Sequence, residues 1–215
     1  MNNLLKLLTR NYIPRNIINI FRIFVLSKTK NMKNIITFAG SNSKNSINKQ
    51  LAIYASTLVK DVNVTVLDLN DFKLPIYGID YEIEHGIPDN AHKFLDYIKS
   101  SDGLILSLAE HNGTYATVFK NLFDWMSRID GKLWSNKPML LMATSPGARG
   151  GLTVLESALG RFPSMGANII ESMSFPSFHD NFKNDEIINK SAKLWEYIFN
   201  SKNVKKINFD SELSL

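Results

Sequence analysis

The chain has 215 residues, 44% of them hydrophobic and 21% charged, which suits one globular domain with short extensions. It contains no cysteine, and this excludes disulfides, thiolate nucleophiles and cysteine-ligated zinc or iron–sulfur sites. The formal net charge is +5, but residues 1–31 hold six basic residues and no acidic ones, so residues 32–215 carry a net charge of −1. The basic character therefore belongs to the N-terminal segment, and we expect no nucleic-acid partner.

The N-terminal segment, residues 1–31, contains an apolar run from Ile17 to Leu26 that two polar residues interrupt. This run is shorter than the roughly 20 residues of a membrane-spanning helix, so we expect no integral membrane association. Three interpretations stay open: a dispensable or disordered segment upstream of a start at Met32, a targeting peptide, or a helix on a membrane surface. We expect the folded domain to cover residues 32–202, followed by a polar tail at 203–215, and a cytoplasmic location.

Strand and helix patterns alternate from Lys33 onward. A short apolar run ending at Gly40 predicts a buried parallel strand. The segment 68–90 contains two prolines and two glycines and predicts an unusually long loop, of a kind that is often functional. The most apolar strand, 103–108, is predicted to lie at the centre of the sheet. The predicted strands are 35–39, 62–67, 103–108, 138–143 and 167–171. The predicted helices are 48–60, 88–99, about 116–128, about 152–162 and 185–200.

Five strands that alternate with five helices indicate right-handed βαβ units. The predicted fold class is therefore α/β: a flavodoxin-like three-layer sandwich whose five-stranded parallel sheet has the order 2-1-3-4-5, with helices on both faces. In such sheets a ligand binds beyond the carboxyl ends of the strands. The loops after strands one, three and four meet there, and these three loops also have unusual compositions.

The first loop, residues 40–48, is rich in serine and asparagine and lies between a strand end and a helix start. Backbone amides at a helix N-terminus bind anions, and three serine hydroxyls can donate to phosphate oxygens. Lys44 can add positive charge, and Asn48 can cap the helix or donate as well. No G-x-x-x-x-G-K-[ST] or G-x-G-x-x-G motif occurs, which favours a terminal monophosphate. The alternative is a plain N-cap cluster in a surface turn.

The second loop, residues 109–115, combines several groups suited to a planar ligand. Gly113 permits an unusual backbone angle or a close approach to such a ligand. Asn112 and main-chain amides can bond the edge of a heterocycle. His111 can stack on a ring or titrate, although a lone histidine is more often structural. Glu110 can order the loop by accepting N–H bonds, or it can face solvent.

The third loop, residues 144–151, places one arginine among three glycines and a proline. Gly147 and Gly150 would let main-chain amides reach the carbonyls of a bound ring. Arg149 would attract the phosphate of a nucleotide co-substrate. The alternative is an ordinary tight turn with a solvated arginine.

Taken together, these residues resemble the NADPH-dependent FMN reductase family of the flavodoxin-like superfamily, which includes quinone, chromate and azo-dye reductases. The three loops are similar to the family's G-S-x-R-x-x-S-x-N, P-E-Y-N-G-S and S-P-G-x-x-G-G, and Lys120–Trp125 matches its K-N-x-x-D-W. The similarity covers about residues 33–175. Ser43 replaces the family's arginine, with Lys44 beside it, so neutralisation of phosphate charge is expected to be weaker or supplied differently. His111 and Ala109 replace tyrosine and proline, which changes the surface flanking the ring.

The resemblance implies FMN as the cofactor and NADPH or NADH as co-substrate. Hydride would pass to flavin N5, and the electrons would go on to a quinone-like or other small acceptor in ping-pong turnover. We expect no catalytic acid or base and no metal ligand. Residues implied to bind the cofactor are Ser41, Ser43, Lys44, Ser46, Ile47, Asn48, Ala109, Glu110, His111, Asn112, Gly113, Thr114, Ser145, Pro146, Gly147, Ala148, Arg149 and Gly150.

Family members are commonly homodimers or homotetramers, which implies a homo-oligomer here. Phe72, Tyr77, Tyr81 and the Trp125–Trp134 region are predicted either to bury an interface or to pack in the core. Three other functions stay open. A flavodoxin-type electron carrier is disfavoured by the near-neutral domain and the first loop, and a hydrolase by the lack of a G-x-S-x-G motif. A regulatory domain that has lost its cofactor would share the fold.

Overall fold

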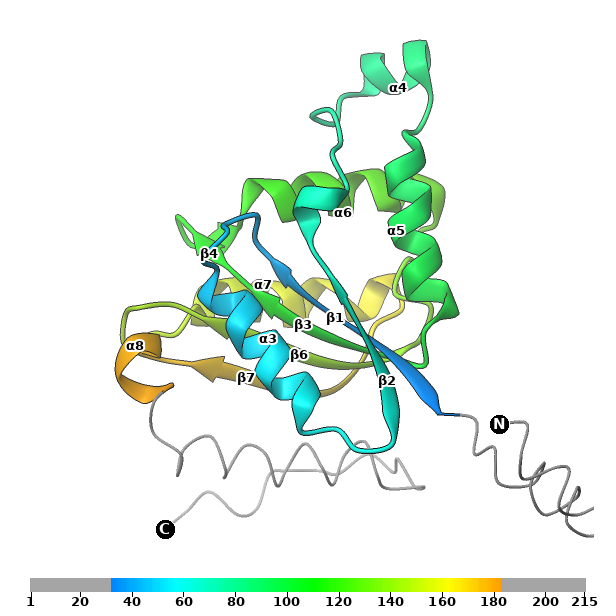
Figure 1. Cartoon of the computed structure of the whole chain (residues 1–215). Coiled ribbons are helices and arrows are strands. Elements are labelled where there is room, and N and C mark those ends of the chain that lie inside the picture. The colour runs from blue at the N-terminus through cyan, green and yellow to red at the C-terminus, as the bar shows by residue number, and fades with distance from the viewer. Residues whose placement is uncertain (1–31, 183–215) are drawn as a thin grey trace, which may run out of the picture. The chain divides into compact units, whose positions relative to one another are not determined.

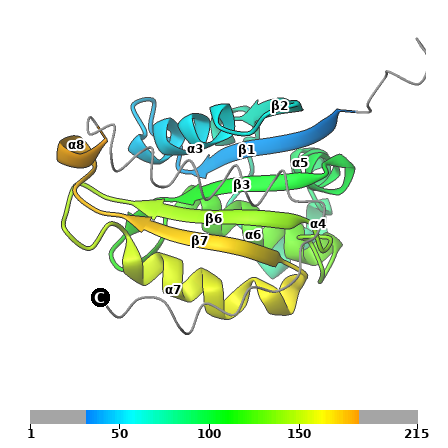
Figure 2. The same ribbon diagram turned by 90° about the horizontal axis from the view of Figure 1, so that it is seen from below.

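The central feature of the computed structural model, which describes residues 32–182, is a parallel sheet of five strands (Figure 1). The strands are β1 (Lys33–Gly40), β2 (Val62–Leu67), β3 (Gly103–Leu108), β6 (Pro138–Thr144) and β7 (Asn168–Phe175). Their order is β2-β1-β3-β6-β7, and Figure 2 shows them side by side in this order. The predicted α/β class and the 2-1-3-4-5 strand order are confirmed.

Two hydrophobic cores lie on opposite faces of the sheet, because successive side chains of a strand point to opposite sides. The larger core joins Ile36 and Phe38 of β1 to the helices α5 (Asp89–Ser100), α6 (Thr117–Ile129) and α7 (Leu152–Arg161). The smaller core joins Ile35 to α3 (Ile47–Thr57) and α8 (Phe178–Asn181). All of β3 is buried, which confirms its predicted central position.

The segment 68–90 differs from its prediction as a loop. It contains a 3₁₀ turn, η1 (Leu69–Asp71), and a helix, α4 (Ile79–His85), which stands away from the sheet in Figure 1. None of the seven residues of α4 is buried. Because seven residues are too few for a helical period of apolar positions to stand out, the sequence pattern did not reveal it.

Several boundaries also differ from the sequence expectations. The fifth strand reaches Phe175 rather than residue 171, and the first helix ends at Thr57 rather than residue 60. The short helix α8 was not predicted. The predicted helix at 185–200, the segment 1–31 and the tail at 203–215 lie outside the described residues. Within residues 32–182, no helix combines the length and apolar character that crossing a bilayer requires.

Three of the large aromatic side chains singled out in the sequence are buried, and two of them, Phe72 and Trp134, belong to the larger core. Trp125 and Trp134 are fully buried and Phe72 is 7% exposed. Core packing, rather than an interface, therefore explains these three residues. Tyr81, at 38% exposed, is different, and the interface interpretation stays open for it.

Candidate functional site

The three predicted loops meet at the carboxyl edge of the sheet, and the side chain of Asn48 holds two of them in place. Its Oδ1 accepts hydrogen bonds from Ser107 Oγ at 2.7 Å and from the Thr144 amide at 3.0 Å, and its Nδ2 donates to the Thr144 carbonyl at 3.1 Å. The side chain is 3% exposed. Asn48 thus fixes the start of α3 against the ends of β3 and β6.

The first loop presents unused donors at the N-terminus of α3. The helix cap is Ser46, whose Oγ accepts from the Lys49 amide at 3.2 Å, so the prediction that Asn48 caps the helix is wrong. Ser41 Oγ accepts from the Ser43 amide at 3.2 Å. Both hydroxyls act as acceptors here, which leaves their own protons available.

The backbone amides of Ile47 and Asn48 complete this donor set. Within residues 32–182 neither amide has a hydrogen-bond acceptor. The first turn of α3 contains no acidic residue. A helix N-terminus with unsatisfied amides and no competing carboxylate is suited to an anion.

The two lysines near this loop differ in whether they form an ion pair with an acidic residue. Lys49 Nζ lies 2.5 Å from Asp68 Oδ2, and this hydrogen bond is the main cause of the lowered pKa of the Asp68 carboxyl. Lys44 is exposed and has no ion-pair partner in the described part of the chain. Lys44 is therefore the cation of the first loop whose charge is not already used.

The second loop is a small β-hairpin rather than an irregular loop. Its strands β4 (Glu110–His111) and β5 (Thr114–Tyr115) pair antiparallel. Asn112 and Gly113 have φ values of +51° and +75°. Two positive values at the central positions characterise a type I′ turn, for which Asn-Gly is the preferred sequence. The dipeptide is the signal that could have revealed the hairpin, and it places His111 and Thr114 opposite each other at the exposed tip.

Glu110 joins this hairpin to the helix that follows the third loop. Its Oε2 accepts from the Val154 amide at 3.1 Å, in the first turn of α7. A carboxylate is stabilising there because the helix N-terminus carries partial positive charge. The prediction that Glu110 orders its loop by accepting an N–H bond is confirmed.

Gly150 of the third loop has a packing role that the sequence did not predict. Gly150 has a φ of +57°, and a Cβ there would lie 2.6 Å from Ser174 Oγ and 2.7 Å from the Phe175 carbonyl carbon. Its amide donates to the Gly147 carbonyl at 3.1 Å. The Gly150 amide itself is thus engaged within the loop, and the expectation that these glycines let main-chain amides reach the carbonyls of a bound ring stays a prediction. Gly147 has no close neighbour, since a Cβ there would meet only Ser145 Oγ at 3.9 Å.

Arg149 lies where the second and third loops approach each other. Its Nη2 donates to Thr153 Oγ1 at 3.2 Å, and its side chain is exposed. A Cβ on Gly113 would lie 3.8 Å from the Thr153 methyl group, so the hairpin tip borders the same residue. An exposed guanidinium thus stands beside the hairpin turn.

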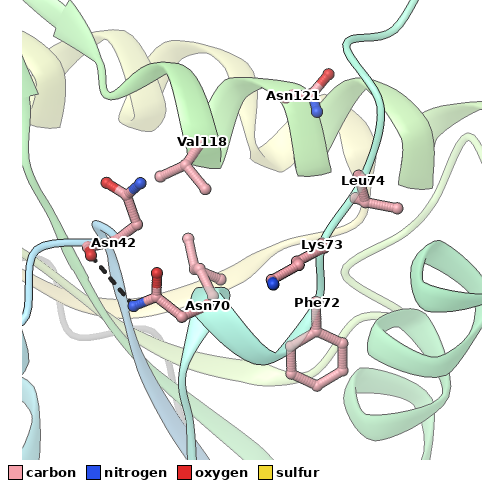
Figure 3. Close-up of a pocket in the computed structure, with 8 residues that line it drawn as sticks. Asn42, Asn70, Phe72, Lys73, Leu74, Val118 and Asn121 are labelled. Carbon is pink, nitrogen blue, oxygen red and sulfur yellow. Dashed lines mark hydrogen bonds between the residues drawn. The ribbon is translucent and has the colours of Figure 1, made fainter.

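A pocket of about 200 Å³ lies between the first loop, the segment 69–74 and α6 (Figure 3). The sequence did not predict it. Its lining is apolar at Leu69, Phe72, Leu74 and Val118 and polar at Asn42, Asn70, Lys73 and Asn121. The Asn42 carbonyl accepts from Asn70 Nδ2 at 3.1 Å, which ties the first loop to η1. The pocket borders the segment 68–90, whose length was the only signal in the sequence.

Comparisons with known proteins agree on one group. A sequence model described as NADPH-dependent FMN reductase matches residues 33–180. An uncharacterized protein of Mycoplasma pneumoniae is 30% identical over 160 residues, which cover 72% of this chain and 93% of that protein. A quinone reductase of Escherichia coli K12 is 29% identical over 121 residues, or 54% of this chain and 62% of the relative. The chain thus matches less than two thirds of that quinone reductase.

Solved structures show the same fold. The flavoenzyme FerB, an NAD(P)H:acceptor oxidoreductase of Paracoccus denitrificans, aligns with a TM-score of 0.61 at 23% identity and covers 78% of this chain and 97% of that one. An azoreductase of Bacillus anthracis aligns with a TM-score of 0.58 at 17% identity, covering 79% of this chain and 99% of that one. At these identities the likeness concerns the fold alone.

Proposed function

The chain belongs to the NADPH-dependent FMN reductase family, and from this premise we propose that it is an NAD(P)H-dependent FMN oxidoreductase that reduces a small acceptor such as a quinone. Relatives named quinone reductase and NAD(P)H-dependent FMN reductase support the proposal at about 30% identity. The observation that carries it is the donor set of the first loop at the N-terminus of α3.

This donor set fits a terminal phosphate. The amides of Ile47 and Asn48 and the hydroxyls of Ser41 and Ser46 can all donate, and the first turn of α3 has no acidic residue. We propose that the FMN phosphate binds here. With Ser43 at the position of the family's arginine, Lys44 is the residue that supplies positive charge.

The ring of the cofactor would lie against the second and third loops. The type I′ turn presents Asn112 and Gly113, and the Glu110–Val154 hydrogen bond keeps the hairpin in one position. The exposed guanidinium of Arg149 beside it suits a phosphate of the nicotinamide co-substrate. Gly147, which packing leaves unconstrained, is the third-loop glycine proposed to approach the ring.

Bound FMN would supply the redox chemistry, accepting hydride from reduced nicotinamide and passing electrons to the acceptor. The residues of this chain would hold the phosphate, position the ring and admit two substrates in turn. These tasks need no catalytic acid or base. We also propose a homo-oligomeric, cytoplasmic protein, and these two statements stay predictions.

An absorbance spectrum before and after addition of NADPH or NADH tests the proposal. The full chain, purified or mixed with FMN, is expected to show flavin absorbance that the reduced nicotinamide bleaches and a quinone restores. Bleaching without sustained turnover would favour an electron carrier. Protein that does not bind FMN would overturn the proposal and favour a cofactor-free domain.

A matched pair of lysine variants tests the phosphate site. Lys44→Ala is expected to weaken FMN binding about tenfold, the usual size of one lost hydrogen bond to a charged group. Lys33→Ala removes an equally exposed lysine at the opposite end of β1 and should leave the affinity unchanged. Fluorescence titration of FMN measures both. Equal affinities for the two variants would show that Lys44 does not contact the phosphate.

A further inference from the structure

The pocket between the first loop, the segment 69–74 and α6 uses none of the residues proposed to bind the cofactor. The second and third loops do not line it, and the first loop contributes only Asn42. Its volume is about 200 Å³. An apolar cavity of about 150 Å³ already holds one benzene ring. The pocket therefore has room for one aromatic ring or for two fused rings.

Hydrogen bonds hold the walls of this pocket in place. Asn70 Nδ2 donates to the Asn42 carbonyl at 3.1 Å and to Asp68 Oδ1 at 2.8 Å, which joins the first loop to η1 (Figure 3). Asn90 Nδ2 donates to the Lys73 carbonyl at 2.9 Å and so fixes the backbone of the segment 69–74. Walls that are already fixed reduce the entropy cost of binding a ligand. The pocket is thus preformed, as small-molecule sites usually are.

The lining combines apolar side chains with two unused hydrogen-bond donors. Its apolar residues are Leu69, Phe72, Leu74 and Val118. At the edge of the pocket, Lys73 Nζ has neither an ion-pair nor a hydrogen-bond partner within residues 32–182 (Figure 3). The side-chain amide of Asn42 is likewise free of partners among the described residues, because only its backbone carbonyl accepts a hydrogen bond. An apolar surface beside an ammonium group and an amide suits a flat apolar molecule that carries an acceptor group.

The charges around the pocket favour a negatively charged acceptor group. No acidic residue lines it. Lys93 adds a second cation near the floor, with its Nζ 5.6 Å from the centre of the Phe72 ring. Asp68, which holds Asn70 in place, is paired with Lys49 at 2.5 Å. A carboxylate in the pocket would therefore meet unpaired positive charge, and a charged acceptor strengthens the hydrogen bonds that it receives.

We propose that this pocket is a second ligand site, which binds a small aromatic carboxylate of one ring or two fused rings. The rings lie against the apolar side chains of the lining, and the carboxylate accepts hydrogen bonds from Lys73 Nζ and Asn42 Nδ2. The site does not depend on flavin binding, because its lining residues and the residues proposed to bind FMN are different sets. A ligand here would occupy a place next to the first loop without displacing the cofactor.

Isothermal titration calorimetry of the full chain with 2-naphthoate tests the proposal. A dissociation constant of about 0.1–1 mM is expected, which is usual for a ligand of this size. The uncharged 2-naphthalenemethanol keeps the rings and should bind about tenfold more weakly, because it lacks the charge that the two donors recognise. Acetate keeps the charge without the rings and should show no binding. Absence of 2-naphthoate binding at about 5 mM, or equal binding of the alcohol, would overturn the proposal.

Two lysine variants locate the bound carboxylate. Lys73→Ala is expected to weaken 2-naphthoate binding about tenfold and to leave the binding of the alcohol unchanged, because only the carboxylate interacts with the ammonium group. Lys33→Ala removes an exposed lysine at the start of β1 and should change neither affinity. Both substituted side chains are exposed, so both variants should fold, which circular dichroism checks. If Lys73→Ala bound 2-naphthoate as the wild type does, the anion would not be held in this pocket.

The same titration in the presence of saturating FMN separates the pocket from the proposed flavin site. The affinity for 2-naphthoate is expected to change by no more than about threefold, because salt screens the interaction between exposed charges. Competition between the two compounds would mean that 2-naphthoate occupies the flavin site, and the proposal would be wrong. If the chain did not bind FMN at all, the proposed function would fail, and the comparison of Lys73→Ala with the wild type would still decide on the pocket.

Discussion

The first and third loops have the same place in the fold but are built differently. Both connect the carboxyl end of a strand to a helix, and both are rich in small or polar residues. In the first loop residues 42–45 are exposed, and the amides at the start of α3 lack acceptors within the described residues. In the third loop, Gly150 and Gly151 are buried, and Ser174 Oγ donates to the Arg149 and Gly150 carbonyls at 3.0 and 3.1 Å.

This difference shows that a similar composition can serve packing in one loop and leave binding groups available in another. The third loop has glycine at position 150 because the end of β7 and the proline that follows it leave no room for a side chain. The first loop is serine-rich, and its serines organise a helix N-terminus without using all of its donors. A substitution at Gly150 should therefore change stability, and substitutions in the first loop should change ligand binding as well.

The largest effect is expected from Gly150→Ala. The new methyl group would lie 2.6 Å from Ser174 Oγ and 2.7 Å from two backbone atoms, at a φ of +57°. Positive φ and overpacking together are expected to lower the free energy of unfolding by about 4 kcal/mol. Gly147→Ala, in the same loop but with nothing nearer than 3.9 Å, should cost less than about 1 kcal/mol. Urea denaturation of both variants measures the difference, and equal stabilities would refute the packing role of Gly150.

Asn48→Ala should have the next largest effect, because this residue connects the two loops. The change leaves the Ser107 hydroxyl and the Thr144 amide without their acceptor in a buried site. Unsatisfied buried groups of this kind cost about 1–3 kcal/mol each, so we expect a loss of about 3 kcal/mol. Asn45→Ala, at an exposed position of the same loop, is the control and should change stability little.

The sequence predicted the fold well for reasons that are local. Periodicity and turn residues identified five strands and four of the described helices, and the strongly apolar sequence of β3 indicated its central position. The role of Asn48 could not be predicted, because its partner Thr144 lies 96 residues away. The steric need for glycine at position 150 likewise depends on Ser174 and Phe175, which a reading of the third loop alone does not include. The helix α4 was not predicted because its seven residues are too few to show a helical period.

Ser46→Ala is expected to have a moderate and two-part effect. The change removes the N-cap of α3, which typically costs about 1 kcal/mol of stability. Under the proposed function it also removes a phosphate donor, so FMN affinity should fall by more than stability alone explains. Ser101→Ala is a matched control, since Ser101 is buried at the opposite end of the neighbouring strand β3. If both variants bound FMN like the wild type, the first loop would be a plain helix cap.

The smallest effect is expected for the ion pair between Lys49 and Asp68. This pair joins the first turn of α3 to the residue that caps η1. The hydrogen bond from Lys49 lowers the pKa of the Asp68 carboxyl in the folded state. A carboxyl with a lowered folded-state pKa stabilises the fold fully above its unfolded pKa, and this contribution disappears as pH falls through the folded value. Since both side chains are about one third exposed, the pair should contribute less than about 1 kcal/mol.

Lys49→Met therefore tests this ion pair through the response of stability to acid. Near pH 7 the variant should be slightly less stable than the wild type, and the difference should vanish in strong acid, where Asp68 is protonated in both states. Lys33→Met removes an exposed lysine that has no ion-pair partner within residues 32–182 and should give no such convergence. Denaturant unfolding across this pH range measures the curves. A constant gap between Lys49→Met and the wild type would mean that the lysine acts through packing, and the first loop would then resemble the third.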